Sequence, residues 1–146
     1  MSDLLLPLLK LGAALVLSAA VGLERLLSEK PAGMRTHILV GFGSALFMIV
    51  ADLGGLDAGR VAAGLITGIG FLGAGTIIQE RGTVHGLTTA ASIWAVAGIG
   101  IAVSRGLWLL SLFATLGIIA VLWGLHFIED VIERSKKKSR ISKNTK

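Results

Sequence analysis

The sequence contains no cysteine, and only 16% of its 146 residues are charged. Without cysteine the chain forms no disulfide, and it offers neither a thiol nucleophile nor a sulfur-ligated metal site. It also lacks a Walker pattern, and its serines have no evident histidine and aspartate partners. These absences predict a protein that is not an enzyme. They also exclude a nucleotide-driven pump, unless a separate subunit supplies the nucleotide domain.

Hydrophobic residues dominate the remaining composition. They make up 53% of the chain, and the mean hydropathy is +0.81. Five apolar stretches occupy most of the sequence: residues 4–23, 36–53, 61–78, 87–103 and 107–128. Helices of this length span roughly 26–33 Å at about 1.5 Å per residue, which is close to the thickness of a bilayer's hydrocarbon core. We therefore predict an all-α, multi-pass membrane protein built as a bundle of five transmembrane helices.

The basic residues predict how this bundle is oriented. If the N-terminus lies outside, eleven of the fourteen lysines and arginines fall on the inner side, and Lys10, Arg60 and Arg105 fall on the outer side. Short loops rich in Lys and Arg stay cytoplasmic. We expect the N-terminus outside, a transmembrane domain over residues 1–128 and a basic cytoplasmic tail over residues 129–146. Because Asp3 and Lys10 depart from a signal-peptide pattern, we expect the first stretch to be retained.

The basic tail raises the question of a nucleic-acid partner. Seven of the fourteen basic residues lie in Arg134–Lys146, and the sequence pI is about 10.1. A polybasic run just inside a final span is typical of contact with anionic lipid headgroups. The alternative is a solvated tail whose positive charge only keeps the C-terminus on the cytoplasmic side. We expect the lipid bilayer and its anionic lipids as partners, and no nucleic acid.

Small residues recur at four-residue spacing in the apolar stretches. They occur at Ala14/Ser18/Gly22, Gly41/Ala45, Gly64/Gly68, Gly70/Ala74, Ala91/Ala95 and Gly98/Ala102. Such pairs let helix backbones approach closely in lipid, where no hydrophobic force drives association. Tight packing within one bundle accounts for the pattern, and a homo-oligomeric interface is the alternative.

Two central segments carry a resemblance to a known family. Residues 70–78 read GFLGAGTII and residues 86–95 read GLTTAASIWA, and both resemble motifs of the MgtC/SapB membrane family. Residues 22–25 (GLER) and 32–36 (AGMRT) match earlier motifs of that family in the same order. The resemblance covers roughly residues 8–129.

The resemblance implies a five-helix protein of the bacterial inner membrane that is linked to magnesium homeostasis and growth at low magnesium. For some pathogens it also implies a link to virulence. The activity of the family has two interpretations, magnesium transport or modulation of other membrane complexes such as the F-type ATP synthase. Longer members carry a C-terminal cytoplasmic ACT-like domain, whereas a basic tail follows Phe127 here.

Charged residues on the outer side form the first candidate site. Lys10 lies in the outer half of the first stretch, and Asp52 lies at the outer end of the second. The two residues could form a structural ion pair, or Lys10 could extend to the interface. Alternatively, Asp52 and Asp57 form the mouth of a cation path, since Mg²⁺ prefers hard oxygen ligands and needs one or two carboxylates.

The inner side carries a larger polar group. Its members are Glu24, Arg25, Arg35, Glu80, Arg81, Thr88 and Thr89, together with His37 and His85. They act either as helix caps and Glu–Arg pairs, or as a polar pocket that binds a hydrated ion, a headgroup or a partner protein. Within such a pocket we expect Glu80 to be the main residue and Thr88 the second, as a cap or as a hydroxyl facing the pocket. No catalytic residue is predicted, and the sequence assigns no metal site.

Regulation and transport are the two functions that this pattern allows. A conduction path needs polar groups through the depth of the membrane, and here the middles of the stretches hold Gly, Ala and aliphatic residues with scattered hydroxyls at Ser18, Ser44 and Thr67. A lone charge at the bilayer centre costs at least about 2.5–3.5 kcal/mol. We therefore favour a regulator without a cofactor. The alternative is a transporter or channel for Mg²⁺ or another cation, with Mg²⁺ as ligand or transported ion.

Overall fold

Five helices and one short β-hairpin make up the part of the chain that this computed structural model describes, residues 2–80 and 82–124. The elements are α1 (Ser2–Leu27), α2 (Met34–Leu53), α3 (Ala58–Ala74), β1 (Ile78–Glu80), β2 (Thr83–His85), α4 (Leu87–Ser104) and a fifth helix (Trp108–Gly124). The all-α class and the five helices expected from the sequence are thus present. The predicted tail, and residues 125–128 of the last stretch, lie outside the described residues.

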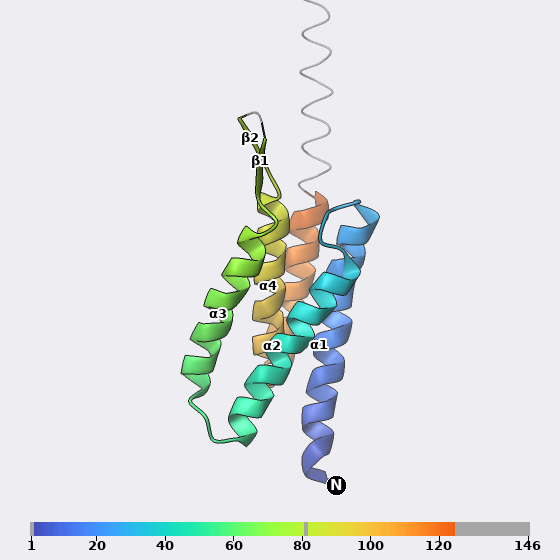
Figure 1. The fold of residues 1–146 in the computed structure, drawn as a ribbon. Coiled ribbons are helices and arrows are strands. Elements are labelled where there is room, and N and C mark those ends of the chain that lie inside the picture. Colours follow the sequence, from blue (N-terminus) through green and yellow to red (C-terminus); the bar gives the residue numbers. More distant parts are fainter. Residues whose placement is uncertain (1, 81, 125–146) are drawn as a thin grey trace, which may run out of the picture.

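The helices run alternately in opposite directions, side by side (Figure 1). The α1–α2 connection, the hairpin and the end of the fifth helix lie at one end of the bundle, which we call the hairpin end; the N-terminus lies at the other. Among the described residues, three helices are long and apolar enough to cross a membrane: Leu4–Leu27, Met34–Leu53 and Leu87–Ser104. Helix α3 and the described part of the fifth helix have 17 residues each, or about 25 Å of helix.

The third helix is shorter than the apolar stretch that predicted it. It ends at Ala74, so that the last residues of the stretch 61–78 form a turn and the start of β1. The Thr76 hydroxyl donates a hydrogen bond to the Gly73 carbonyl at 2.8 Å and helps to close the helix end. The β-branched residues that follow favour extended backbone. The apolar stretch 61–78 therefore extends beyond the end of helix α3.

The expected inner loop over residues 79–86 is a hairpin. Strands β1 and β2 pair antiparallel, with Ile78 opposite His85 and Glu80 opposite Thr83. The hairpin ends at Gly86, whose φ of 87° favours glycine and where a side chain would overlap the Thr76 carbonyl. The hairpin is therefore joined tightly to the start of α4. Arg81, a predicted site residue, lies outside the described residues.

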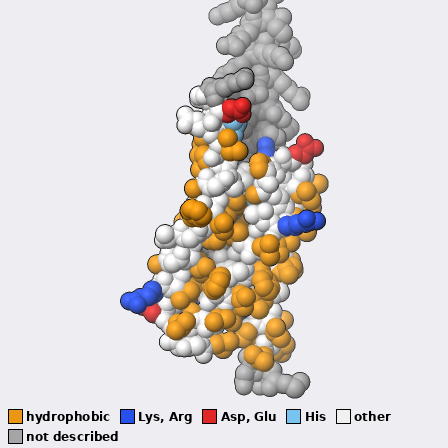
Figure 2. Space-filling view, in the orientation of Figure 1, with side chains coloured by type: hydrophobic (Ala, Val, Ile, Leu, Met, Phe, Trp, Pro, Cys, Tyr) orange, Lys and Arg blue, Asp and Glu red, His pale blue; other side chains and the backbone are white. Residues whose placement is uncertain are grey.

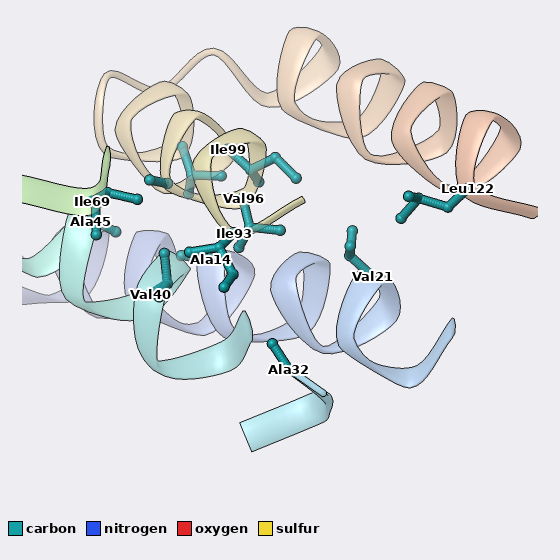
Figure 3. Close-up of a cluster of buried hydrophobic side chains, with 12 residues drawn as sticks. Ala14, Val21, Ala32, Val40, Ala45, Ile69, Ile93, Val96, Ile99 and Leu122 are labelled. Carbon is teal, nitrogen blue, oxygen red and sulfur yellow. The ribbon is translucent and has the colours of Figure 1, made fainter. Parts of the chain in front are cut away.

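The core lies where α1, α2 and α4 meet. Figure 3 shows Ala14 of α1, Val40 of α2, and Ile93 and Val96 of α4 close together, and all four are at most 8% exposed. Ile69 of α3 and Leu122 of the fifth helix extend the same cluster. Helix α4 contacts α1, α2 and α3, so the element that is fourth in sequence is central in space.

Large apolar side chains cover the outside of the bundle. Figure 2 shows hydrophobic side chains along most of the visible face, with few charged groups among them. Phe71 on α3 is 82% exposed, and Trp123 on the fifth helix is 73% exposed. Such extensive apolar surface is unfavourable in water and marks a membrane-embedded protein.

The recurring small residues of α1, α2 and α3 divide into two groups. Those of α1 and α2 are buried: Ala14, Ser18, Gly22, Gly41 and Ala45 lie in the contact between these helices or against α4. Three glycines of α3 behave differently, although Gly73 of the same helix is buried against Ala90. Gly64, Gly68 and Gly70 are exposed, and no atom lies within 4 Å of where their side chains would begin. Packing within one bundle thus explains the first group and leaves the second unexplained.

Candidate functional site

A cleft of about 460 Å³ opens at the hairpin end of the bundle. It lies between the loop that follows α1, the start of α4 and the fifth helix. It is lined by Arg25, Glu29, Lys30, Pro31, His85, Gly86, Thr88, Thr89, Val121 and Leu122. We call it the Arg25 cleft. Its walls are polar on the loop and α4 sides and apolar on the fifth helix.

Arg25 is the most buried charge in this cleft. Its side chain is 3% exposed and forms a two-point ion pair with its neighbour Glu24: Nε to Oε2 at 2.6 Å and Nη2 to Oε1 at 2.8 Å. The Ser28 hydroxyl donates a third hydrogen bond to Glu24 Oε1, at 2.8 Å. Glu24 is therefore well satisfied. Arg25 is not, because its buried Nη1 has no partner among the described residues.

The loop 28–33 places Lys30 beside this pair. The Lys30 amide donates to the Arg25 carbonyl at 3.0 Å, and Glu29 has a positive φ of 53°, so the chain turns sharply after α1. Pro31 and Gly33 end the turn, and α2 begins at Met34. The helix breakers of the sequence thus bring a lysine and a glutamate to the rim of the cleft.

The opposite wall is the start of α4. The residue before the helix is Gly86, and no side chain caps the first turn. Thr88 therefore does not act as the cap, one of the two roles considered for it, and instead lines the cleft as an exposed residue. Thr89 lines the same cleft but is 3% exposed. The uncapped N–H groups give this wall a partial positive charge.

A buried histidine joins α2 to α4 behind the cleft. His37 is 0% exposed; its Nδ1 lies 2.9 Å from the Gly33 carbonyl oxygen and its Nε2 lies 3.0 Å from Ser92 Oγ. Ser92 Oγ also lies 2.8 Å from the Thr89 carbonyl oxygen. The sequence placed His37 at the inner interface, whereas the structure places it inside the bundle as a structural link. Ser92 was not singled out, because a serine in an apolar helix carries no signal of its partner.

The predicted inner residues are thus only partly brought together. The cleft collects Arg25, Thr88 and Thr89, with Glu24 paired to Arg25. Arg35 is exposed and lines a separate depression with Leu26 and Met34. Glu80, the expected main residue, is exposed on β1 and does not line the cleft. His85, also expected on the inner side, lines the cleft, and Glu29 and Lys30 complete it without having been predicted as members of the site.

The outer residues form two small, separate interactions. Asp52 pairs with Arg105, at 2.7 Å from Nη1 to Oδ1, and not with Lys10, which was one of the alternatives considered from the sequence. The partner differs because the α4–fifth helix turn lies beside the end of α2, which sequence order did not reveal. Asp57 accepts a hydrogen bond from the Arg60 amide at 3.1 Å and caps α3. The described residues include no group of three or more His, Asp or Glu side chains suited to hold a metal ion.

Comparison with known proteins gives the family. The YhiD protein of Escherichia coli K12, whose name marks it as a candidate magnesium transporter, is 41% identical over 129 residues, which cover 82% of this chain and 60% of YhiD. The MgtC protein of Salmonella typhimurium LT2 is 44% identical over 110 residues, covering 75% of this chain and 48% of MgtC. An uncharacterized Synechocystis protein, slr0014, is 44% identical over 102 residues, covering 68% and 44%.

The chain spans about half the length of these curated relatives. No solved structure matches it. The sequence model of the MgtC family matches residues 11–131, which include most of α1 and the other four helices of the described region. The chain therefore belongs to the MgtC family, and its apolar helices mark it as a membrane protein.

Proposed function

We propose that this chain is a regulator of another complex in the bacterial inner membrane, that it acts in magnesium homeostasis, and that it has no catalytic activity of its own. The family and the names of its relatives support the link to magnesium. The regulatory role is supported by one observation above all, the close contact of α2 and α4 at the centre of the bundle.

Gly100 of α4 packs directly against the backbone of α2. A methyl group added at Gly100 would overlap the Gly41 carbonyl oxygen and lie 3.0 Å from Cβ of Ser44. Gly41 in turn packs against Ser18 of α1, so three helices meet here. Mg²⁺ keeps several waters and demands octahedral oxygen ligands at about 2.1 Å. This contact leaves no space for a hydrated ion between these helices.

Three hydroxyl groups elsewhere in the bundle bond carbonyls of their own helices, whereas the buried Ser18 Oγ and Ser44 Oγ at the contact itself have no partner among the described residues. Thr67 donates to the Ala63 carbonyl at 3.0 Å, and Thr115 donates to the Ser111 carbonyl at 2.8 Å. Ser111 itself donates to the Leu107 carbonyl at 2.8 Å. Thr67, Ser111 and Thr115 thus satisfy helix carbonyls and form no row of ligands, which also favours regulation.

The open face of α3 is where we place the partner. Gly64, Gly68 and Gly70 are exposed and have nothing within 4 Å, and Phe71 beside them is 82% exposed. Small residues allow a second helix to approach closely in lipid. The partner contributes that helix, and a second copy of this chain is the alternative occupant. The F-type ATP synthase is the candidate partner that the family resemblance names.

We further propose that the hairpin end faces the cytoplasm and that all five helices cross the membrane. The alternating helix directions of Figure 1 support this, because they place Arg25, Lys30 and Arg35 on one side and Arg60 and Arg105 on the other. That distribution follows the bias of basic residues toward the cytoplasm.

Transport is the second candidate function. It is favoured by the name of YhiD, which marks that relative as a candidate magnesium transporter. In this chain it requires a path between copies, lined by the exposed α3 glycines, because the α1–α2–α4 contact is closed.

Reconstitution separates the two functions. The purified full chain is placed in liposomes that enclose a magnesium-sensitive dye, and Mg²⁺ is added outside with an inward-negative potential. We expect no Mg²⁺ entry above that of empty vesicles. Entry that scales with the amount of protein would overturn the regulatory proposal and establish transport.

Co-reconstitution tests the partner. Vesicles containing purified F-type ATP synthase are prepared with and without this chain, and ATP-driven proton pumping is followed with a pH-sensitive dye. We expect the chain to change the pumping rate and the variant Gly68→Leu to lose the effect, because a large side chain blocks backbone approach on α3. Gly117→Leu, in equally open space on the fifth helix, is the matched control and retains the effect. Unchanged pumping excludes this partner.

A further inference from the structure

The guanidinium of Arg25 has an edge that the ion pair with Glu24 does not use. The pair occupies Nε and one hydrogen of Nη2. Both hydrogens of Nη1 remain, and Nη1 is buried without a partner among the described residues, in a side chain that is 3% exposed and lines the Arg25 cleft. A buried charged donor left unpaired is costly. The remaining Nη1/Nη2 edge is the geometry that binds two oxygens of one oxyanion.

Further hydrogen-bond donors converge on the same cleft. Lys30 lines it from the loop after α1, and the Thr88 hydroxyl and the uncapped first turn of α4 line it from the other side. The first N–H groups of a helix bind phosphate through hydrogen bonds and through the helix dipole. His85 contributes another ring nitrogen at the rim. Lys30, the Thr88 hydroxyl, the first turn of α4 and His85 thus offer hydrogen-bonding groups to the same kind of ligand.

Two carboxylates limit how the ligand is held. Glu24 neutralises much of the Arg25 charge, and Glu29 lines the cleft next to Lys30 in the same loop. The cleft therefore does not attract anions by a large net charge. It selects a group with several acceptor oxygens that can reach several donors at once, which describes a phosphate group and not a halide.

We propose that the Arg25 cleft binds a phosphate group, held by the free edge of Arg25, by Lys30 and by the start of α4. This site does not depend on the proposed regulation or on transport. The ligand is either a lipid headgroup, whose acyl chains would follow the apolar wall of Val121 and Leu122, or a soluble phosphate compound. Both sources present the same oxygens.

Two binding measurements on the full chain in detergent distinguish the sources. In the first, the unfolding temperature is followed by tryptophan fluorescence while sodium phosphate replaces sodium chloride at constant ionic strength. In the second, native mass spectrometry measures retention of phosphatidic acid and phosphatidylglycerol, with diacylglycerol as the lipid that lacks phosphate. A soluble ligand raises the unfolding temperature in the first measurement, and a headgroup gives selective retention in the second.

The variants Lys30→Gln and Thr88→Val test the cleft and leave the Glu24–Arg25 pair intact. Arg25→Lys keeps the charge but removes the two-point edge. We expect each to weaken phosphate binding, with Arg25→Lys weakening it at least about tenfold, the loss expected for one charge-assisted hydrogen bond. Arg35→Gln, an exposed arginine outside the cleft, is the control and retains binding. Retained binding in Lys30→Gln and Thr88→Val, an equal loss in Arg35→Gln, or no phosphate dependence in either measurement would overturn the proposal.

Discussion

His37 Nε2 and Ser92 Oγ lie 3.0 Å apart and join α2 to α4 across 55 residues of sequence. Both side chains are buried, and the second ring nitrogen of His37 is bonded to the Gly33 carbonyl. A neutral imidazole satisfies this arrangement by donating from Nδ1 to Gly33 and accepting at Nε2 from the Ser92 hydroxyl. A cationic ring donates at both nitrogens, and the Ser92 hydroxyl then donates to the Thr89 carbonyl.

Replacement of Ser92 by alanine tests this link. Hydrogen bonds between membrane helices contribute about 0.6 kcal/mol on average and up to about 1.7 kcal/mol. We expect Ser92→Ala to lower the free energy of unfolding by about 1–2 kcal/mol, because it leaves a buried ring nitrogen unpaired. Equilibrium unfolding in mixed micelles measures the change. Ser111→Ala is the matched control, since the buried Ser111 hydroxyl bonds only a carbonyl of its own helix. Equal losses in the two variants would contradict the link.

The two ion pairs should differ in strength. Breaking a buried pair costs about 3–5 kcal/mol because one charge remains uncompensated, and an exposed pair contributes about 0–1 kcal/mol. Glu24→Ala therefore destabilises the fold far more than Asp52→Ala, whose pair with Arg105 is about half exposed. The same unfolding measurement at low and high salt distinguishes them. A salt-sensitive Glu24–Arg25 pair, or an Asp52 loss as large as that of Glu24, contradicts this expectation.

The α2–α4 contact predicts a sharp difference between two glycines of one helix. Gly100→Ala places a methyl group against the Gly41 carbonyl, and such overpacking costs about 1–3 kcal/mol. Gly98→Ala enters open space and gains helix propensity of up to about 1 kcal/mol. Unfolding temperatures should fall for the first variant and hold or rise for the second. A Gly100→Ala protein as stable as the native chain would show that α2 and α4 are not in close contact.

The hairpin junction predicts a second glycine pair. Gly82 and Gly86 both have positive φ, 82° and 87°, so alanine is strained at either position by about 1 kcal/mol. Only Gly86 also lies against the Thr76 carbonyl, whereas Gly82 faces open space. Gly86→Ala should therefore destabilise the fold clearly more than Gly82→Ala, as measured by protease susceptibility of the hairpin. Equal protease susceptibility of the two variants would show that Gly86 is not in close contact with the Thr76 carbonyl.

The absence of cysteine makes the orientation directly measurable. Single cysteines are introduced at Thr83 in the hairpin and at Leu56 between α2 and α3, both exposed positions at opposite ends of the bundle. We expect a membrane-impermeant maleimide to label Leu56→Cys in intact spheroplasts and Thr83→Cys only in inverted vesicles. If the maleimide labelled both cysteines from the same side of the membrane, the chain between Leu56 and Thr83 would not cross the membrane.

The helices were the predictable part of this fold. Charged residues, Pro31 and Gly33 marked the end of α1 and the start of α2, because helix breakers and interfacial charges act locally. The end of α3 was not predictable in the same way. Thr76 and the isoleucines after it continue the apolar stretch of α3, but their backbone is not helical. Hydropathy alone therefore predicted a helix that extends into β1. The short polar hairpin gives too little periodicity to be recognised.

The site was predictable by residue type but not by partner. Glu24 and Arg25 were expected among the inner polar residues, since charged residues mark the interfacial end of a span. Arg105 was not expected as the partner of Asp52, because the two are 53 positions apart and only the packing of the helix ends brings them together. Lys30 and His85 lie in connections, where sequence position does not reveal which wall of a cleft a residue forms.

The central place of α4 sets the order in which the protein can be completed during synthesis. Helices α1 and α2 leave the ribosome first and contact each other, yet the partner of His37 Nε2 arrives only with Ser92. During insertion there is therefore a stage at which His37 Nε2 has no hydrogen-bond partner on α4. At that stage the surface of α2 that Gly100 contacts is also still uncovered. Translation must proceed past α4 before the nascent membrane domain can close.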